Sequence, residues 1–315
     1  MMEHAQIAGM PVCVIGFGCA AMGGYDYGTV DDAESIDAVH AAIDNGVNFF
    51  DVADIYGLGH AEEVLGRALA SRRGKVRVAT KFGLVSRGRG TERDASAAHV
   101  ADAVDRSLTR LGIDTIDLYQ LHWPDPRTPF AETAGALQRC RDAGKIRAAG
   151  VCNVTLAEAK EMNELMPLAS IQVAYNLLCR GVENDLLPWC RAEGIALLAH
   201  SSLARGFLAP GVRTIDGTDT RSRSRYFDDE NESEKRVVRD VVAAIAKSRV
   251  VSEAAVAVRW VLDRGVDCAL AGIRNRGQLE AQLGAVGWSL SEDEMNALLD
   301  VSANCPGVMT GELAQ

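Results

Sequence analysis

The segment VNFFDVADIYG (residues 47–57) joins a short apolar stretch to two titratable side chains, Asp51 and Tyr56. Two further stretches are built in the same way: VRVATK ends at Lys81, and IDLYQLH ends at His122. Titratable side chains at the carboxyl ends of successive buried strands are typical of the catalytic face of a (β/α)8 barrel. The four side chains therefore indicate both a fold class and a candidate catalytic group.

Apolar, strand-like segments alternate with amphipathic, helix-like segments along nearly the whole chain. Continuous apolar composition indicates parallel strands that are buried on both faces, and eight strands with helical crossovers favour a closed barrel. The candidate strands are 12–16, 47–51, 76–81, 115–121, 147–151, 169–173, 195–199 and 267–271. The prediction is an α/β fold, a (β/α)8 TIM barrel, with residues 1–315 forming a single domain.

Helices are expected between these strands, for example over 96–111, where apolar residues recur at helical spacing. Thr155 and Glu158 have the spacing of a capping box before a helix over 156–166. Residues 209–234 break the alternation, because glycine, proline, arginines and an acidic run show no clear period there. Two interpretations of this segment stay open: a solvated surface loop, or a flexible lid over the barrel mouth.

Composition narrows the classes of partner. The net charge of −10 argues against nucleic acid as the main partner. No signal-like segment and no uninterrupted apolar run of about 18 residues is visible, so no membrane partner is expected. The eight cysteines are dispersed without a C-x-x-C pair, which favours reduced thiols and a cytoplasmic location. The six histidines show no H-x-H or H-E-x-x-H spacing, so no metal site is expected.

The run VIGFGCAAMGG matches a dinucleotide-binding motif, G-x-G-x-x-A, through Gly16, Gly18 and Ala21. That fold needs a helix directly after the motif and an acidic residue about 20 residues on, at the tip of the next strand. Gly23 and Gly24 oppose an immediate helix, and the acids at that distance fall in a predicted helix. These glycines are better explained as the end of the first barrel strand, where a flat ligand can approach the backbone closely.

The four titratable residues form a plausible acid catalyst. A free tyrosine has a pKa of about 10, so its proton is hard to donate unaided. A lysine about 4 Å away would stabilise the phenolate by about 4 kcal/mol at an effective dielectric of 20. Asp51 would keep Lys81 charged and oriented while partly cancelling its field. His122 could donate to the substrate oxygen and fix its position.

The chain resembles the aldo-keto reductase superfamily at these residues and beyond them. The family's D-x-A-x-x-Y-G, its lysine, L-H-x-P, G-x-S-N, the next-strand glutamine and S-x-L-x-R-G-x-L occur in order. The matching residues are Asp51, Ala53, Tyr56, Gly57, Lys81, Leu121, His122, Pro124, Gly150, Cys152, Asn153, Gln172, Ser201, Leu203, Arg205, Gly206 and Leu208. The later run AGIRNRGQLEAQLGA resembles the family's segment for adenine and the 2′-phosphate, so the resemblance covers essentially the whole chain.

The resemblance implies NADPH lying extended across the strand tips and hydride transfer to a small-molecule carbonyl, with Tyr56 as proton donor. Asn153 and Gln172 would bind the nicotinamide carboxamide, Arg205 the pyrophosphate and Arg274 the 2′-phosphate. The implied cofactor-binding residues are Gly18, Cys152, Asn153, Gln172, His200, Ser201, Leu203, Arg205, Gly272, Arg274, Gln278 and Gln282. Competing readings are a Schiff-base aldolase that uses Lys81, and a cofactor sensor or accessory subunit with little turnover.

Two positions depart from the family pattern. Cys152 stands where serine is usual, and a thiol is a weaker donor. His200 stands at an aromatic position, where we expect it to stack on the nicotinamide. Because an unperturbed histidine has a pKa of about 6.5, binding of NADP+ is expected to weaken at lower pH.

The sequence leaves the substrate open among a small aldehyde, a ketone and a keto-sugar. Tyr25, Tyr27, Trp123 and the 209–234 loop are expected to shape the pocket. The oligomeric state is open as well, and an oligomer is possible.

Overall fold

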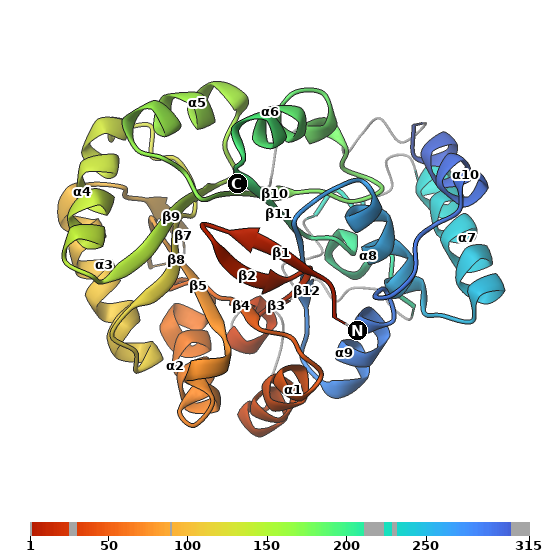
Figure 1. Ribbon diagram of the computed structural model, residues 1–315, viewed down its shortest axis with the longest axis horizontal. Coiled ribbons are helices and arrows are strands. Elements are labelled where there is room, and N and C mark those ends of the chain that lie inside the picture. Colours follow the sequence, from red (N-terminus) through yellow and green to blue (C-terminus); the bar gives the residue numbers. More distant parts are fainter. Residues whose placement is uncertain (1, 25–29, 89, 211–223, 229–231, 304–315) are drawn as a thin grey trace.

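Eight parallel strands close into a barrel in the computed structural model, which describes residues 2–24, 30–88, 90–210, 224–228 and 232–303 (Figure 1). Hydrogen bonds between the last strand and the first, with Gly272 opposite Gly18, complete the ring. The barrel strands are β3 (Ile15–Gly18), β4 (Phe49–Asp51), β5 (Arg77–Phe82), β8 (Ile116–Leu121), β9 (Ile146–Cys152), β10 (Ser170–Ala174), β11 (Ala196–His200) and β12 (Cys268–Gly272). The prediction of a (β/α)8 barrel is confirmed.

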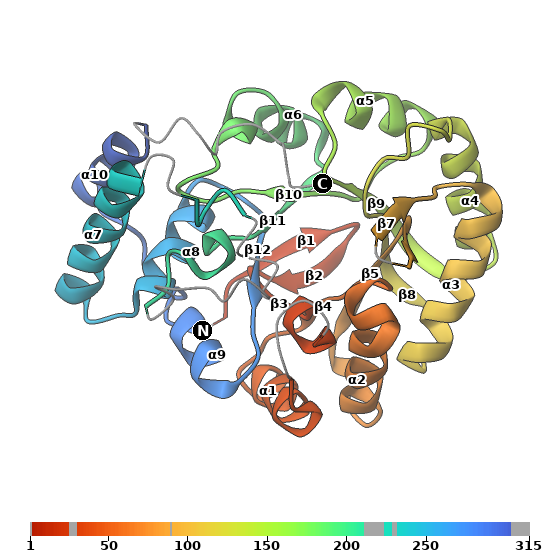
Figure 2. The same ribbon diagram turned by 180° about the vertical axis from the view of Figure 1, so that it is seen from behind.

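Helices form an outer layer around the barrel, as Figures 1 and 2 show from opposite sides. They are α1 (Asp32–Asp44), α2 (His60–Leu69), α3 (Ala97–Leu111), α4 (Phe130–Asp142), α5 (Leu156–Leu165), α6 (Leu186–Glu193), α7 (Glu232–Arg249), α8 (Glu253–Asp263), α9 (Arg276–Leu283) and α10 (Glu292–Ala303). The predicted capping box is present, because Glu158 N donates to Thr155 Oγ1 and Thr155 N to Glu158 Oε2. α7 and α10 pack against each other outside the regular ring.

The bounds of the first strand differ from the prediction of 12–16. The chain first forms an antiparallel hairpin, β1 (His4–Ile7) with β2 (Met10–Cys13), which crosses the barrel in Figure 1. The barrel strand β3 begins only at Ile15. Cys13 N donates to Asn48 Oδ1 at 2.7 Å instead of to a barrel neighbour, which separates the two strands. The continuous apolar run VCVIGF hid this break, because Val12 and Cys13 at the end of the hairpin are as apolar and buried as the first residues of β3.

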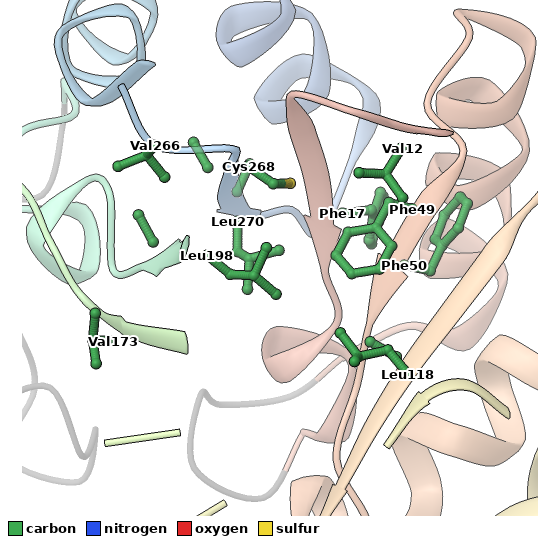
Figure 3. Packing of buried hydrophobic residues seen from close by; sticks show 14 of the residues in the cluster. Val12, Phe17, Phe49, Phe50, Leu118, Val173, Leu198, Val266, Cys268 and Leu270 are labelled. Carbon is green, nitrogen blue, oxygen red and sulfur yellow. The ribbon is translucent and has the colours of Figure 1, made fainter. Parts of the chain in front are cut away.

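The interior of the barrel is apolar where the strands begin and polar where they end. Figure 3 shows Phe49, Leu270 and Cys268 in this part of the interior, whereas Phe17 and Phe50 pack against each other on the outer side of their strands, with ring centroids 5.4 Å apart. A Cβ on Gly16 would lie 2.7 Å from Leu270 Cδ2 and 3.0 Å from both Cys268 Sγ and Phe49 Cδ1, so this layer is tightly filled. An apolar floor of this kind leaves the strand tips as the place for chemistry.

Two sequence expectations concern loops. β3 is followed by the short 3-10 turn η1 (Ala20–Gly23) instead of a helix, which agrees with rejecting the dinucleotide-fold interpretation of the glycines. Residues 211–223 and 229–231, most of the 209–234 segment, lie outside the described residues, so its role as a lid stays a prediction. Its last three residues, 232–234, belong to α7.

Candidate active site

A buried ion pair joins the tips of two neighbouring strands. Lys81 on β5 donates from Nζ to Asp51 Oδ1 at 2.5 Å and to the backbone oxygen of Val52 at 3.0 Å. The Lys81 side chain is fully buried. Burial lowers the pKa of Lys81, but the charges of Asp51 and Tyr56 outweigh burial and raise this pKa, so the ammonium stays charged.

Tyr56 lies on the other side of the same ammonium. Lys81 Nζ is 3.4 Å from the Tyr56 hydroxyl oxygen and 5.1 Å from the centre of its ring. Tyr56 opens the 3-10 turn η2 (Tyr56–Gly59), in which Gly57 has φ +59°. A Cβ on Gly57 would lie 2.2 Å from the carbonyl oxygen of Gly23, so a glycine is required for this turn to pack against η1.

His122 completes the group that the sequence predicts. Its ring meets the Tyr56 ring edge-on, with centroids 5.8 Å apart and planes at 83°. Burial, then the charge of Lys81 and the neighbouring His200, holds the pKa of His122 well below its ordinary value. The imidazole is therefore neutral at physiological pH. Its Nδ1 is buried and has no hydrogen-bond partner among the described residues, which leaves it able to meet a ligand.

A layer of glutamine amides underlies the ion pair. Gln172 on β10 donates from Nε2 to Asp51 Oδ2 at 2.9 Å, and Gln120 on β8 donates to the same oxygen at 3.4 Å. Sequence reasoning missed Gln120. The signal was available, because Gln120 is a polar residue within a buried strand and lies in register with Lys81. The two amides donate to Asp51 Oδ2, the carboxylate oxygen that Lys81 does not bind. If Gln172 binds the nicotinamide carboxamide, as predicted, it must therefore use its Oε1 or its second N–H.

Cys152 and Asn153 lie at the tip of β9. Asn153 donates from Nδ2 to the carbonyl oxygen of His122 at 2.9 Å, and its Oδ1 lies 3.0 Å from His200 Nε2. The Cys152 thiol is buried, and burial raises its pKa against the opposing charge of Lys81, so it remains a neutral thiol. This wall of the site is therefore uncharged.

His200 differs from the expectation of a titrating imidazole. Burial, with the positive charges of Arg205 and Lys81, lowers the pKa of His200 to about 3. Its two ring nitrogens lie 3.0 Å from Ser201 Oγ and from Asn153 Oδ1. The predicted loss of NADP+ affinity through protonation near pH 6.5 is therefore wrong for this site. The stacking role of His200 stays a prediction.

Strained backbone marks the loops that follow the strand tips. Non-glycine residues with positive φ are uncommon and cluster at ligand sites. In these loops they are Leu58, Asn153, Ser201, Ala204 and Arg205, with φ between 48° and 57°. Arg205 belongs to η5 (Ala204–Gly206), directly after Leu203. The S-x-L-x-R segment thus contains three non-glycine residues in the left-handed region, Ser201, Ala204 and Arg205.

The predicted adenosine segment forms the turn between β12 and α9. Asn275 caps α9 by accepting from Gln278 N at 3.0 Å, as the predicted helix start requires. Gln278 Oε1 accepts from Arg274 N at 2.8 Å. Gln282 donates to the carbonyl oxygen of Gly272 at 3.1 Å, and its own Oε1 is buried with no hydrogen-bond partner among the described residues.

The two arginines of this turn have different surroundings. Arg276 pairs with Asp37 on α1 through both its Nε and its Nη2, the latter 2.6 Å from Asp37 Oδ1. A bidentate pair of this kind uses the guanidinium face that would otherwise grip a phosphate. This pairing argues against Arg276 as the phosphate ligand, and the assignment of the phosphate to Arg274 stays a prediction.

Of the predicted pocket residues, Tyr25 and Tyr27 lie outside the described residues. Trp123 follows His122, and the guanidinium carbon of Arg93 lies 4.9 Å from the centre of its ring. Arg93 also donates to the carbonyl oxygen of Pro124 at 3.2 Å. Arg93 ends the hairpin of β6 (Leu84–Arg87) and β7 (Gly90–Arg93), so this hairpin fixes one face of Trp123.

In the described ranges, no cluster of three or more histidine, cysteine or acidic side chains has a geometry suited to a metal ion. None of the helices in the same ranges combines the length and apolarity needed to cross a membrane.

Comparisons with known proteins agree with this geometry. The model of the Aldo/keto reductase family matches residues 14–303. Aldo-keto reductase YhdN of Bacillus subtilis (strain 168) is 38% identical, over 97% of this chain and 96% of that protein. The structure of glycerol dehydrogenase AKR11B4 from Gluconobacter oxydans superposes with a TM-score of 0.89 at 38% identity, covering 96% of both chains. An aldo/keto reductase from Klebsiella pneumoniae, solved with NADP and acetate, has a TM-score of 0.76 and 26% identity, again over 96% of both chains.

Proposed function

This chain belongs to the aldo/keto reductase family and is an oxidoreductase, and from that premise we propose that it uses NADPH to reduce an aldehyde or ketone to an alcohol, with Tyr56 as the proton donor. The observation that carries the proposal is the contact series from Asp51 through Lys81 to Tyr56, with bonds of 2.5 Å and 3.4 Å. The series lies at the polar end of the barrel, where enzymes of this fold place their chemistry.

The residues around the barrel mouth fit a nicotinamide cofactor. Gln282 presents a buried acceptor oxygen without a partner among the described residues, suited to an amino group of an adenine ring. A Cβ on Gly272 would meet no atom within 4 Å, so there is open space beside the backbone at the tip of β12. Arg274 supplies a fixed positive charge beside the start of α9, where an anion is favourable. Arg205 and Asn153 would face the pyrophosphate and the carboxamide.

NADPH, when bound, supplies the hydride that reduces the carbonyl carbon. The residues of the chain act on the carbonyl oxygen. Tyr56 gives its proton to that oxygen, and the phenolate that remains is stabilised by Lys81, whose charge Asp51 maintains. His122, neutral in this environment, holds the oxygen in place by hydrogen bonding. Asn153, which bonds to the His122 carbonyl, fixes the strand tip that carries this imidazole.

The choice of substrate class rests on a relative's name and on the residues at the barrel mouth. The Gluconobacter relative is named a glycerol dehydrogenase, and the mouth of this barrel offers both polar groups and the indole of Trp123. We therefore place small hydroxylated carbonyls, together with keto-sugars, at the head of the candidates. The pocket residues Tyr25 and Tyr27 would join Trp123 in shaping the space for them.

The test is an NADPH-oxidation screen of the purified protein across simple aldehydes, ketones, hydroxylated three-carbon carbonyls and keto-sugars. Turnover of at least one carbonyl by the native protein, lost in Tyr56→Phe, is the expected result. If the protein binds NADPH but turns over no carbonyl in the panel, it behaves as a cofactor sensor or accessory subunit, and the proposed function is wrong.

A further inference from the structure

A second polar cluster lies between the barrel wall and helices α2 and α3. It is close to the turn of residues 52–57, which carries Tyr56 and is called the catalytic turn below. Thr80 and Tyr119 each precede an inward-pointing residue of their strand, so both point away from the barrel interior. Thr80 Oγ1 donates to Glu62 Oε1 at 2.6 Å, and Arg110 Nε donates to Glu62 Oε2 at 2.7 Å. Glu62 is fully buried, and Arg110 balances its charge.

Asp54 connects this cluster to the catalytic turn. It lies between Asp51 and Tyr56 in the sequence, and its backbone nitrogen donates to the carbonyl oxygen of Lys81 at 3.4 Å. Its Oδ1 is buried and has no hydrogen-bond partner among the described residues. The Tyr119 hydroxyl is buried without such a partner as well, and burial, then the charges of Asp54 and Glu62, raises its pKa. Both carboxyl groups are therefore near enough to act on this hydroxyl.

The surroundings of Asp54 disfavour its charged form. Burial, then the negative charge of Glu62, raises the pKa of Asp54 to about 7. The positive charges of Arg110 and Arg106 on α3 and the backbone N–H of Ile55 act in the opposite direction but do not restore an ordinary value. The geometry at Oδ1 acts in the same direction, because a buried carboxylate oxygen without a donor is costly. A protonated carboxyl can instead donate to a neighbouring oxygen.

We propose that Asp54 is a positioning residue for Tyr56, and that it holds the catalytic turn against Lys81 only while its carboxyl is protonated. Ionisation places a second negative charge beside Glu62, and Oδ1 has no donor among the described residues to receive it. The carboxylate must then leave this position or draw water in. Since a single residue separates Asp54 from Tyr56, either movement displaces the phenol from Lys81. The inference rests on the proposed role of Tyr56 as proton donor.

The test compares pH profiles of wild type and Asp54→Asn, since an amide has the shape of a carboxyl, donates a hydrogen bond and cannot ionise. At about pH 8.5 only about 3% of wild-type molecules would keep the Asp54 proton, against about 90% at about pH 6. With saturating NADPH and substrate, kcat of Asp54→Asn should lie within about threefold of wild type at about pH 6 and exceed it about tenfold at about pH 8.5. The dissociation constant of NADPH should be the same for both proteins, because the turn carries Tyr56 and not the cofactor ligands.

The matched control is Asp267→Asn. Burial also raises the pKa of Asp267, but Asp267 lies at the opposite end of β12 from the strand tips and accepts from Leu197 N at 2.8 Å. This variant should leave the pH profile of kcat unchanged. If Asp54→Asn has the pH profile of wild type, or loses activity equally at every pH, the proposal is overturned. Failure of Asp54→Asn to fold at about pH 6 would also contradict it, since the amide would then not replace the protonated acid.

Infrared difference spectra between about pH 6 and about pH 8.5 provide a readout that needs no turnover. Wild type should lose the carbonyl stretch of a protonated carboxylic acid over this range, and Asp54→Asn should not show that loss. Absence of the band from wild type at the lower pH would refute a protonated Asp54 outright. If the band is present but no carbonyl is reduced, the protonation holds and the proposed function fails instead, so the two failures are distinguishable.

Discussion

Replacement of Tyr56 by phenylalanine removes one hydroxyl and leaves the ring that packs edge-on against His122. In the native protein, Lys81 Nζ lies 3.4 Å from that hydroxyl oxygen. At an effective dielectric of 20, the attraction between the ammonium and a phenolate at this distance is about 5 kcal/mol. Asp51, 2.5 Å from the same ammonium, cancels part of it. Several kcal/mol of stabilisation thus remain for the group that gives up the proton.

We expect Tyr56→Phe to lower kcat by about 10²–10⁴-fold, the usual contribution of a positioned general acid, which corresponds to about 3–5 kcal/mol. The dissociation constant of NADPH should change by less than about twofold, because the Tyr56 hydroxyl acts on the substrate oxygen in the transition state and not on the bound cofactor. The assay is NADPH oxidation at saturating substrate, with cofactor dissociation constants from fluorescence titration. A deuterated cofactor shows whether hydride transfer limits the rate.

The control for a disturbed site is Trp123→Phe, which changes a pocket side chain and keeps the Asp51, Lys81 and Tyr56 contacts. Its kcat should fall much less than that of Tyr56→Phe. Suppose instead that Tyr56→Phe keeps more than about a tenth of the wild-type kcat while showing a clear isotope effect. Tyr56 would then not be the proton donor, and the electrostatic reasoning from Lys81 would be wrong for this site.

Three further results are expected. Arg274→Ala should weaken NADPH binding about tenfold to a hundredfold and barely change NADH binding, because a charge-assisted contact contributes about 1.5–3 kcal/mol. Arg276→Ala, which removes a guanidinium paired with Asp37 on α1, should change the affinity for neither cofactor. Equal losses of NADH and NADPH affinity in Arg274→Ala would exclude Arg274 from the phosphate site. The ratio of NADP+ to NADPH affinities should show no step attributable to His200 between about pH 5 and pH 8, because the pKa of this imidazole is about 3. A step near pH 6.5 that disappears in His200→Phe would contradict this. Asp51→Asn should lower the free energy of unfolding by about 3–5 kcal/mol in chemical denaturation, because it leaves the buried Lys81 ammonium without its partner, and a change within about 0.5 kcal/mol would refute it.

The barrel could be predicted from the sequence because its strands are apolar and largely buried on both faces. Several of them also end at a polar or titratable residue. Composition alone could not separate β2 from β3, since Val12 and Cys13 at the end of β2 are as apolar and buried as the start of β3, and the break between the strands depends on the side chain of Asn48. The titrating His200 was a wrong expectation for a related reason. Burial and the charges of Arg205 and Lys81 are set by folding, and a sequence without coordinates gives only the unperturbed pKa.

Polar residues missed in the sequence share another feature. Gln120 and Asp54 lie within motifs whose neighbours have obvious chemistry, and neither has a distinctive spacing of its own. The role of Gln120 comes from alternation along β8, and that of Asp54 from the turn that follows β4. Gln120 shares the interior with Lys81, whereas Thr80 faces the helices with Glu62. The sequence therefore predicts which residues could react, and the fold determines which of the remaining polar residues support them.

The geometry also favours one of the two groups that could give a proton to a carbonyl oxygen. A protonated His122 would be buried beside the Lys81 ammonium, and both conditions disfavour it. Loss of a proton from Tyr56, by contrast, creates a negative charge 3.4 Å from that same ammonium. One buried cation thus suppresses the acid form of His122 and stabilises the base form of Tyr56. Because Asp51 keeps this cation charged, the ion pair supports the proposal that the phenol donates the proton while the imidazole stays a neutral hydrogen-bonding group.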